Sequence, residues 1–312
     1  MPHPITSVTV HAPGTVANLV CGFDILGLCL HEPYDIMDVK LLPEKEIVIH
    51  SADGYPLPSD PKDNTAGAPL IEMLAELEDN IGFEVTIHKR IKPGSGVGSS
   101  AASAAGAVVA ANHLLGNRFS KEQLVQFAMF GEKVASGVKH ADNIAPCIYG
   151  GVTLIRSIHP LDIIALQPPD LHVTIVHPQI EVKTADARAI LKQKILLKDA
   201  IRQWGNIAGL VAGIVQQDNA LIGRSLEDVL IEPVRSILIP GFDEVKQRSK
   251  EAGALGGGIS GSGPSIFMLS ADKATAQNVE KTMQEVFTRV GIAYHTHVTQ
   301  INTTGVKIVA EA

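Results

Sequence analysis

Residues 92–116 read KPGSGVGSSAASAAGAVVAANHLLG, and this stretch decides how the first half of the chain folds. One proline and three glycines fall within its first seven residues, so its beginning cannot form regular structure. From Ser99 onward the stretch is rich in alanine, the best helix former, and Gly116 ends that helix. Just before it, Phe83–Lys89 alternates apolar and polar residues as a strand does. We therefore expect the order strand, glycine loop, helix.

A glycine loop at the N-terminus of a helix can bind phosphate. Its backbone N–H groups and the positive end of the helix dipole attract an anion, and glycines let the backbone come close to it. Ser99 and Ser100 can cap the helix, or offer hydroxyls to phosphate or Mg²⁺. The alternative is a tight turn with a serine N-cap. The Walker A motif requires a lysine after its last glycine, but here Ser99 follows Gly98. The dinucleotide-binding motif requires a glycine at the position of Ser99.

Two further segments are rich in turn formers. APGTVAN, at 12–18, is followed by Gly22, Phe23 and Asp24, and GGGISGSG, at 256–263, lies between two predicted strands. A hairpin turn rarely needs so many glycines. Three such segments in a chain of 312 residues argue against reading all three as ordinary turns.

Apolar periodicity predicts the remaining elements. Strands are expected over 7–11, 34–42, 46–50, 152–155, 171–177 and 293–299, and on both sides of the glycine turn at 261–264. Helices are expected over 65–77, 120–134, 185–191, 196–215, 242–252 and 274–290, and 160–169 is expected to be a connection. Because strands alternate with helices and most strands suit antiparallel pairing, we expect an α+β fold in both halves.

Composition excludes several classes of protein. A length of 312 residues suits two domains, and 45% hydrophobic with 19% charged residues suits a folded interior. The net charge of -7 argues against a nucleic-acid partner. No apolar run approaches the ~18 residues of a membrane span, and no signal peptide is evident, so we expect no membrane partner and a cytoplasmic location. Cys21, Cys29 and Cys147 form no CxxC pair, so we expect reduced, buried thiols.

The three glycine-rich segments together resemble the motifs of the GHMP kinases. PGSGVGSSAA is similar to the phosphate-binding motif PxxxGLGSSAA, with Val97 in place of leucine, and GGGISGSGPSIF is similar to the C-terminal glycine motif. The resemblance implies a domain like ribosomal protein S5 domain 2 over 1–157 and a ferredoxin-like domain over 158–312, with ATP bound between them. It implies these ATP contacts: Lys92, Pro93, Gly94, Ser95, Gly96, Val97, Gly98, Ser99, Ser100, Ala101, Ala102, Gly261, Ser262 and Gly263.

Other segments resemble the homoserine kinases among the GHMP kinases. PGTVANLVCGFDILG is similar to PATxANLGxGFDxxG, although Val20 and Cys21 replace the commoner Gly-Pro pair. GVKHADNIAP at 137–146, a TxxAR-like stretch at 184–188 and an EPxR segment at 232–235 also match. This resemblance implies transfer of the γ-phosphate of ATP to the hydroxyl of L-homoserine, giving O-phospho-L-homoserine and ADP in threonine biosynthesis. It also implies a homodimer.

The resemblance assigns Mg²⁺ to Ser100 and Glu132. Arg188 and Arg235 can grip a carboxylate with bidentate contacts, and Asp24 can bind the ammonium group of an amino acid.

Asn18, His140 and Asn143 would orient the rest of the acceptor, and Asn143 and Glu132 would be the catalytic residues. Mevalonate kinases use an aspartate near the position of Asn143, where Asp142 is adjacent. The sequence leaves open whether any side chain acts as a base.

Two alternatives remain at this point. Another GHMP enzyme, such as a mevalonate-pathway kinase or decarboxylase, binds an acceptor with a carboxylate but without an ammonium group, and has no use for Asp24. A catalytically silent sensor of the same family would be expected to lose the loop serines or the magnesium carboxylate, and this chain keeps both.

Overall fold

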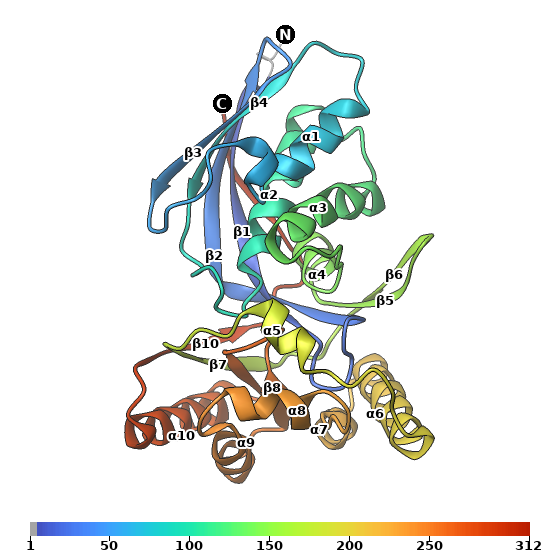
Figure 1. The fold of residues 1–312 in the computed structure, drawn as a ribbon, viewed down its shortest axis with the longest axis vertical. Coiled ribbons are helices and arrows are strands. Elements are labelled where there is room, and N and C mark those ends of the chain that lie inside the picture. The colour runs from blue at the N-terminus through green and yellow to red at the C-terminus, as the bar shows by residue number, and fades with distance from the viewer. Residues whose placement is uncertain (1–4) are drawn as a thin grey trace.

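The computed structural model describes residues 5–312 and contains two sheets (Figure 1). The larger sheet has seven strands in the order β11-β1-β2-β4-β3, with β5 paired to β2 and β6 paired to β5. Its strands are β1 (Ser7–Ala17), β2 (Leu26–Leu42), β3 (Ile47–Asp53), β4 (Gly82–His88), β5 (Val152–Ile158), β6 (Leu161–Leu166) and β11 (Lys307–Glu311). All pairs are antiparallel except β3 with β4.

Helices α1 to α4 cover one face of this sheet (Figure 1). They are α1 (Gly67–Ala75), preceded by η1 (Pro61–Asp63), α2 (Ser99–Leu114), α3 (Lys121–Ser136) and α4 (Ile144–Tyr149). The alternation in β4 turns Phe83, Val85 and Ile87 inward, where each is fully buried. Gly106 lets α2 approach the sheet, because a Cβ there would lie 2.5 Å from Met37 Sδ.

The second sheet has four antiparallel strands in the order β10-β7-β9-β8. They are β7 (His172–Pro178), β8 (Gly256–Ile259), β9 (Ile266–Ser270) and β10 (Tyr294–Gln300). The helices of this half are α5 (Thr184–Ala189), α6 (Leu197–Gln216), α7 (Asn219–Ser225), α8 (Glu232–Arg235), continued by η2 (Ser236–Leu238), α9 (Phe242–Glu251) and α10 (Lys273–Val290). In order of sequence the strands lie 4-1-3-2, as in a ferredoxin-like domain, and α9 and α10 pack on the face away from the first sheet (Figure 1).

The structure confirms the expected α+β class and most of the expected elements. It also extends β1 beyond 7–11, adds α4, α7 and α8, and differs in the strands that follow. Residues 160–169, expected to be a connection, contain β6, which extends the first sheet. Strand β2 starts eight residues before the expected 34–42. Strand β11 was not expected, and it returns from the end of the chain to pair with β1. These elements depend on pairing between distant segments, which local periodicity does not report.

Cys21, Cys29 and Cys147 are buried free thiols, as predicted. No helix within residues 5–312 is long and apolar enough to cross a membrane.

Candidate active site

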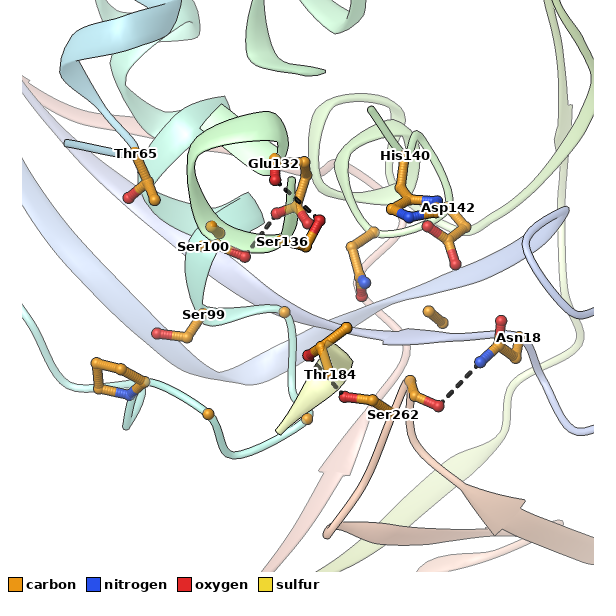
Figure 2. A pocket seen from close by; sticks show the side chains of 18 of the residues that line it. Asn18, Thr65, Ser99, Ser100, Glu132, Ser136, His140, Asp142, Thr184 and Ser262 are labelled. Atoms are coloured by element: carbon orange, nitrogen blue, oxygen red, sulfur yellow. Dashed lines mark hydrogen bonds between the residues drawn. The ribbon is translucent and has the colours of Figure 1, made fainter. Parts of the chain in front are cut away.

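The three glycine-rich segments meet around a cleft of about 330 Å³ between the two halves (Figure 2). Segments more than 200 residues apart in sequence therefore line one cleft, as the resemblance implied. Fifteen of the predicted site residues line this cleft: Asn18, Asp24, Pro93, Gly94, Gly96, Gly98, Ser99, Ser100, Glu132, His140, Asn143, Arg188, Arg235, Gly261 and Ser262.

The glycine loop leads directly into α2. Its last glycine, Gly98, is the N-cap residue and has a φ of 64°, a left-handed conformation that suits glycine. No side chain caps the helix, and Ser99 Oγ instead donates to Ile91 O at 2.8 Å. The serine N-cap considered as an alternative is therefore wrong. The first N–H groups of α2 stay available to an anion such as phosphate.

The C-terminal glycine segment holds the loop in place. Ser260 Oγ donates to Gly96 O at 2.7 Å, and Ser265 Oγ donates to Ser95 O at 2.6 Å. The two loops touch closely, because a Cβ on Gly96 would lie 2.6 Å from Gly263 O. The loop's conformation thus depends on both halves of the chain.

A buried lysine supports the start of α2 from below. Lys89 Nζ donates to Asp35 Oδ2, to Ser99 O at 2.6 Å and to Ser103 Oγ at 2.8 Å. Asp35 Oδ1 accepts the N–H groups of Arg90 and Ile91, each at 2.8 Å. Burial lowers the pKa of Lys89, and Asp35 opposes this effect. The ion pair joins β2, β4 and the first turn of α2, so it fixes the helix end that faces the cleft.

Ser100 and Glu132, to which the resemblance assigns Mg²⁺, are in contact (Figure 2). Ser100 Oγ donates to Glu132 Oε1 at 2.5 Å, and only 7% of Glu132 is exposed. Burial raises the pKa of this carboxyl, and within residues 5–312 no lysine, arginine or histidine pairs with it. A buried carboxylate without a cationic partner, beside a hydroxyl, is a donor set that suits Mg²⁺.

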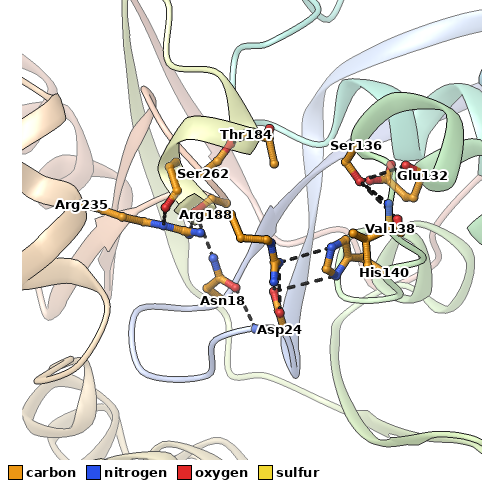
Figure 3. Close-up of polar contacts among 12 residues, drawn as sticks. Asn18, Asp24, Glu132, Ser136, Val138, His140, Thr184, Arg188, Arg235 and Ser262 are labelled. Atoms are coloured by element: carbon orange, nitrogen blue, oxygen red, sulfur yellow. Dashed lines mark hydrogen bonds and ion pairs between the residues drawn. The ribbon is translucent and has the colours of Figure 1, made fainter. Parts of the chain in front are cut away.

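Asp24, His140 and Arg188 form a second polar cluster (Figure 3). Arg188 Nη2 donates to both carboxylate oxygens of Asp24 at 3.0 Å and lies 3.2 Å from His140 Nε2. His140 Nδ1 lies 3.9 Å from Asp24 Oδ1. Burial lowers the pKa of His140, so the ring is neutral near pH 7. A neutral histidine can donate or accept one hydrogen bond here without adding charge.

Arg235 lies next to this cluster and is only 3% exposed. Its Nε donates to Ala187 O at 3.1 Å and its Nη1 to Gly261 O at 3.2 Å. Phe23 contacts both arginines: its ring centre is 4.9 Å from Arg235 Cζ and 5.4 Å from Arg188 Cζ. Burial, and then the charge of Arg188, lower the pKa of Arg235. Two guanidinium groups held this close favour an anion between them.

Asn18 and Asn143 bind neighbouring loops. Asn18 Nδ2 donates to Gly261 O at 3.0 Å, and Asn18 Oδ1 accepts the N–H of Asp24 at 3.0 Å. Asn143 Oδ1 accepts from Thr15 Oγ1 at 2.8 Å. Asp142 also lines the cleft, and burial, with the charges of Asp24 and Glu132, raises its pKa to about 7.

Six predicted ATP-contact residues do not line the cleft. They are Lys92, Ser95, Val97, Ala101, Ala102 and Gly263. Ala101 and Ala102 are buried in the core, Val97 is buried against it, and Lys92 Nζ donates to Gln179 Oε1 at 2.8 Å. The roles of these residues in binding ATP stay predictions.

Sequence reasoning missed Lys89 and the contact of Phe23 with both arginines. A signal for Lys89 was present, since it continues the inward-facing series of Phe83, Val85 and Ile87. A lysine on the buried face of a strand requires a partner, and that requirement points to a structural or functional role. Phe23 gave no such signal, because its contacts depend on arginines more than 160 residues away.

A matched pair of glycine substitutions tests the loop. Gly94 and Gly98 both have positive φ, of 74° and 64°. A Cβ on Gly94 would meet nothing within 4 Å, but one on Gly98 would lie 2.0 Å from Thr15 Oγ1 and 3.2 Å from Asn143 Oδ1. Gly98→Ala is therefore expected to raise the dissociation constant for ATP at least about 10-fold more than Gly94→Ala does. The reason is that a misplaced loop loses contacts to phosphate. Isothermal titration with ATP and Mg²⁺ measures this, and equal affinities would contradict it.

Known proteins match the chain over most of its length. The family model described as GHMP kinases N terminal domain matches residues 66–151, and the one described as GHMP kinases C terminal matches residues 210–289. The homoserine kinase of Chloroherpeton thalassium is 48% identical over 296 residues, which are 91% of this chain and 93% of that protein. The homoserine kinase of Chlorobaculum tepidum is 43% identical over 319 aligned residues, 97% and 98% of the two chains.

A solved structure agrees with these matches. The crystal structure of homoserine kinase from Cytophaga hutchinsonii has a TM-score of 0.93 to this chain at 46% identity, and covers 97% of each chain. The expected domain boundary between 157 and 158 falls between the two segments that the family models match, and stays a prediction.

Proposed function

The chain belongs to the GHMP kinase family, and we propose that it transfers the γ-phosphoryl group of ATP to the side-chain hydroxyl of L-homoserine, giving O-phospho-L-homoserine and ADP. One observation carries the choice of acceptor. The cleft has a helix N-terminus for phosphate at one side, and two arginines with an aspartate at the other. An α-amino acid is the acceptor that needs all three charges.

At the phosphate side, the glycine loop and the uncapped N-terminus of α2 bind the phosphate oxygens. Ser100 and Glu132 would hold Mg²⁺, which when bound neutralises charge on the β- and γ-phosphates. The bonds from Ser260 and Ser265 keep the loop in its binding conformation before ATP arrives. Such preorganisation lowers the entropy that the reaction must lose to align its groups.

At the acceptor side, the existing Arg188–Asp24 ion pair opens to admit the amino acid. The α-carboxylate binds to Arg235 and Arg188, and the α-ammonium group binds to Asp24. A zwitterion brings one charge of each sign, so both groups of the ion pair keep a partner after it binds. This exchange avoids leaving a partly buried charge without a partner.

Asn143 lines the cleft and would orient the hydroxyl through hydrogen bonds, since its side chain does not titrate. Phosphoryl transfer through a loose transition state develops little charge on the attacking oxygen, so the hydroxyl can attack without a strong base. Asp142 lies beside Asn143 in the cleft and has a pKa of about 7. Its carboxylate could accept the proton that the attacking hydroxyl loses. The homodimer and the cytoplasmic location stay part of the proposal.

An ADP-release assay across four acceptors tests the function. L-Homoserine, mevalonate, galactose and shikimate are supplied in turn with ATP and Mg²⁺, and ADP is measured with coupled enzymes. L-Homoserine is expected to give a kcat/KM at least about 100-fold above the others, because only it engages both charges of the acceptor site. Mevalonate turning over as well as homoserine would contradict the proposal.

A further inference from the structure

Arg235 needs support from its surroundings, because the helix that carries it is very short. Helix α8 is one turn of four residues, and Arg235 is its last residue. A helix of this length is not stable on its own. The guanidinium group extends from α8 into the cleft (Figure 3), where a bidentate contact to a carboxylate requires a defined position. The residues that fix α8 therefore decide whether Arg235 can meet the acceptor.

Asp228 fixes the start of α8. Ile231, the N-cap residue, makes no capping bond through its side chain. Asp228 takes over this role, and only 7% of it is exposed. Its Oδ1 accepts the N–H groups of Leu230 at 2.8 Å and Ile231 at 3.1 Å. Its Oδ2 accepts those of Ile231 at 3.2 Å and Glu232 at 2.8 Å. One carboxylate thus provides partners for the backbone groups that the start of a helix leaves unpaired.

The same carboxylate acts on Arg235 through its charge. Asp228 and Arg235 line one small cavity of about 10 Å³, together with Phe23. Burial lowers the pKa of Arg235, and the negative charge of Asp228 is among those that oppose this effect. An asparagine in this place would keep part of the hydrogen bonding but would lose the charge. Asp228 therefore supports Arg235 both by geometry and by charge.

Gln203 joins this turn to the loop that carries Asp24. The side chain comes from α6 and is only 4% exposed. Its Oε1 accepts the N–H of Val229 at 3.0 Å, and its Nε2 donates to Cys21 O at 2.7 Å. Val229 follows Asp228, and Cys21 lies three residues before Asp24. One buried amide therefore links the segment proposed to bind the acceptor's carboxylate to the segment proposed to bind its ammonium group.

The loop with Asp24 depends on such a contact because its backbone is strained. Leu19 and Val20 have φ of 40° and 66°, and Asp24 has a φ of 58°. Positive φ suits glycine and is unfavourable above all for a β-branched residue such as valine. Strained conformations of this kind persist only where the surrounding structure holds them. The bond from Gln203 to the carbonyl group of Cys21, next to Val20, is a contact that does so.

We propose that Asp228 and Gln203 are positioning residues of the acceptor site. Asp228 holds α8 so that Arg235 reaches into the cleft, and Gln203 sets the spacing between α8 and the loop with Asp24. Neither Asp228 nor Gln203 lines the cleft, so both act through the residues that they hold. These roles rest on the proposed phosphoryl transfer to an amino acid.

Removing the carboxylate of Asp228 is expected to weaken the contact to the acceptor's carboxylate. Asp228→Ala should lower kcat/KM for L-homoserine about 10-fold or more, mainly through KM, because a displaced guanidinium group loses its bidentate contact. 3-Aminopropanol has no carboxylate, so its kcat/KM should change little, as should KM for ATP. Asp228→Asn keeps an oxygen for part of the backbone bonds and is expected to lie between Asp228→Ala and wild type.

Asp218→Ala is the matched control. Asp218 caps α7 through the N–H of Leu221 at 2.9 Å, but α7 contributes no residue to the cleft. The control should keep the wild-type ratio of kcat/KM for L-homoserine to kcat/KM for 3-aminopropanol. If Asp228→Ala also keeps this ratio, or if Asp228→Asn keeps it where the alanine variant does not fold, Asp228 does not position Arg235.

A double variant shows whether Asp228 acts through Arg235. In the Arg235→Leu background, Asp228→Ala is expected to lower the ratio of the two acceptors no further, because the residue that Asp228 holds is already gone. Independent effects would instead multiply. A ratio equal to the product of the two single losses would therefore overturn the proposal.

Gln203→Met tests the spacing between the two segments. Methionine has a similar shape but cannot donate to the carbonyl group of Cys21. L-Homoserine must reach Arg235 and Asp24 at once, so its kcat/KM should fall about 10-fold or more. 3-Aminopropanol lacks the carboxylate and 4-hydroxybutyrate lacks the amino group, so each needs only one segment and should lose less. An equal loss for all three acceptors would show that Gln203 only supports the fold.

Wild type separates these roles from the proposed function. If wild type does not prefer L-homoserine to 3-aminopropanol, the assignment of an amino acid as acceptor is wrong. If wild type has this preference and neither Asp228→Ala nor Gln203→Met reduces it, the proposed function stands and the positioning roles are wrong.

Discussion

Replacing Glu132 by glutamine is expected to lower kcat on the order of 10³-fold while the folded protein becomes no less stable. Glutamine keeps the shape of the side chain and an oxygen that can accept from Ser100, but it removes the negative charge that a hard cation needs. The charge on the transferring phosphoryl group then lacks its counter-charge, and such electrostatic stabilisation is usually the largest contribution to catalysis. The apparent Mg²⁺ requirement should rise as well.

The same substitution is expected to raise the stability of the metal-free fold while it lowers kcat. Burial raises the pKa of Glu132 above its ordinary value of 4.5, so the folded state favours the protonated form. As the pH rises above 4.5, this preference is lost and the ionised carboxylate destabilises the metal-free fold. Glutamine carries no such penalty. The melting temperature of metal-free Glu132→Gln at pH 8 is therefore expected to equal or exceed that of wild type.

Glu122→Gln is the matched control for this experiment. Glu122 lies on the same helix, α3, but is exposed and outside the cleft. Steady-state kinetics over a range of Mg²⁺ concentrations, with thermal unfolding by calorimetry, separates the two roles. Normal turnover of Glu132→Gln at low Mg²⁺ would show that the carboxylate does not hold the metal. A large loss of stability would show that it supports the fold.

Replacing Arg235 by leucine is expected to discriminate strongly between acceptors. A charge-assisted contact to a carboxylate in a desolvated site contributes about 2–5 kcal/mol, or roughly 30-fold to several thousand-fold in kcat/KM for L-homoserine. 3-Aminopropanol keeps the hydroxyl and the ammonium group but has no carboxylate, so it should lose far less. KM for ATP should change little.

The ratio of the two acceptors is the informative quantity, because Arg235 also supports its surroundings. It donates to the carbonyl groups of Ala187 and Gly261, and losing these bonds affects every acceptor equally. That shared loss cancels when kcat/KM for homoserine is divided by kcat/KM for 3-aminopropanol. If the ratio is the same in wild type and Arg235→Leu, the arginine does not bind the carboxylate.

Asp24→Asn provides the complementary test. It should penalise homoserine strongly but spare 4-hydroxybutyrate, which has the carboxylate and no amino group. The same variant removes the partner of Arg188, and this contact again affects both acceptors. Opposite preferences in the two variants would support an amino-acid site. If each variant lowers kcat/KM equally for both of its acceptors, Asp24 and Arg235 do not bind the ammonium and carboxylate groups.

The sequence alone determined the elements that depend on neighbouring residues. Alternation identified β4, alanine content and a glycine stop identified α2, and Ser120 identified the start of α3, where a capping box forms. The glycine-rich segments indicated a common site, because their conformations and motifs are local properties that survive without knowledge of the fold. The predicted acceptor and metal residues were named from the resemblance of short segments to known motifs, because their residue types alone did not distinguish them from surface charges.

Tertiary structure alone decided which of these residues touch. That Arg188 pairs with Asp24, that Lys89 reaches both Asp35 and the first turn of α2, and that β11 returns to β1 all depend on contacts across long stretches of chain. The same is true of α6, whose apolar periodicity predicted a helix but could not say which apolar face would be buried. A residue's neighbours along the chain set its backbone conformation, whereas burial and pairing are set by residues brought together only when the whole chain folds.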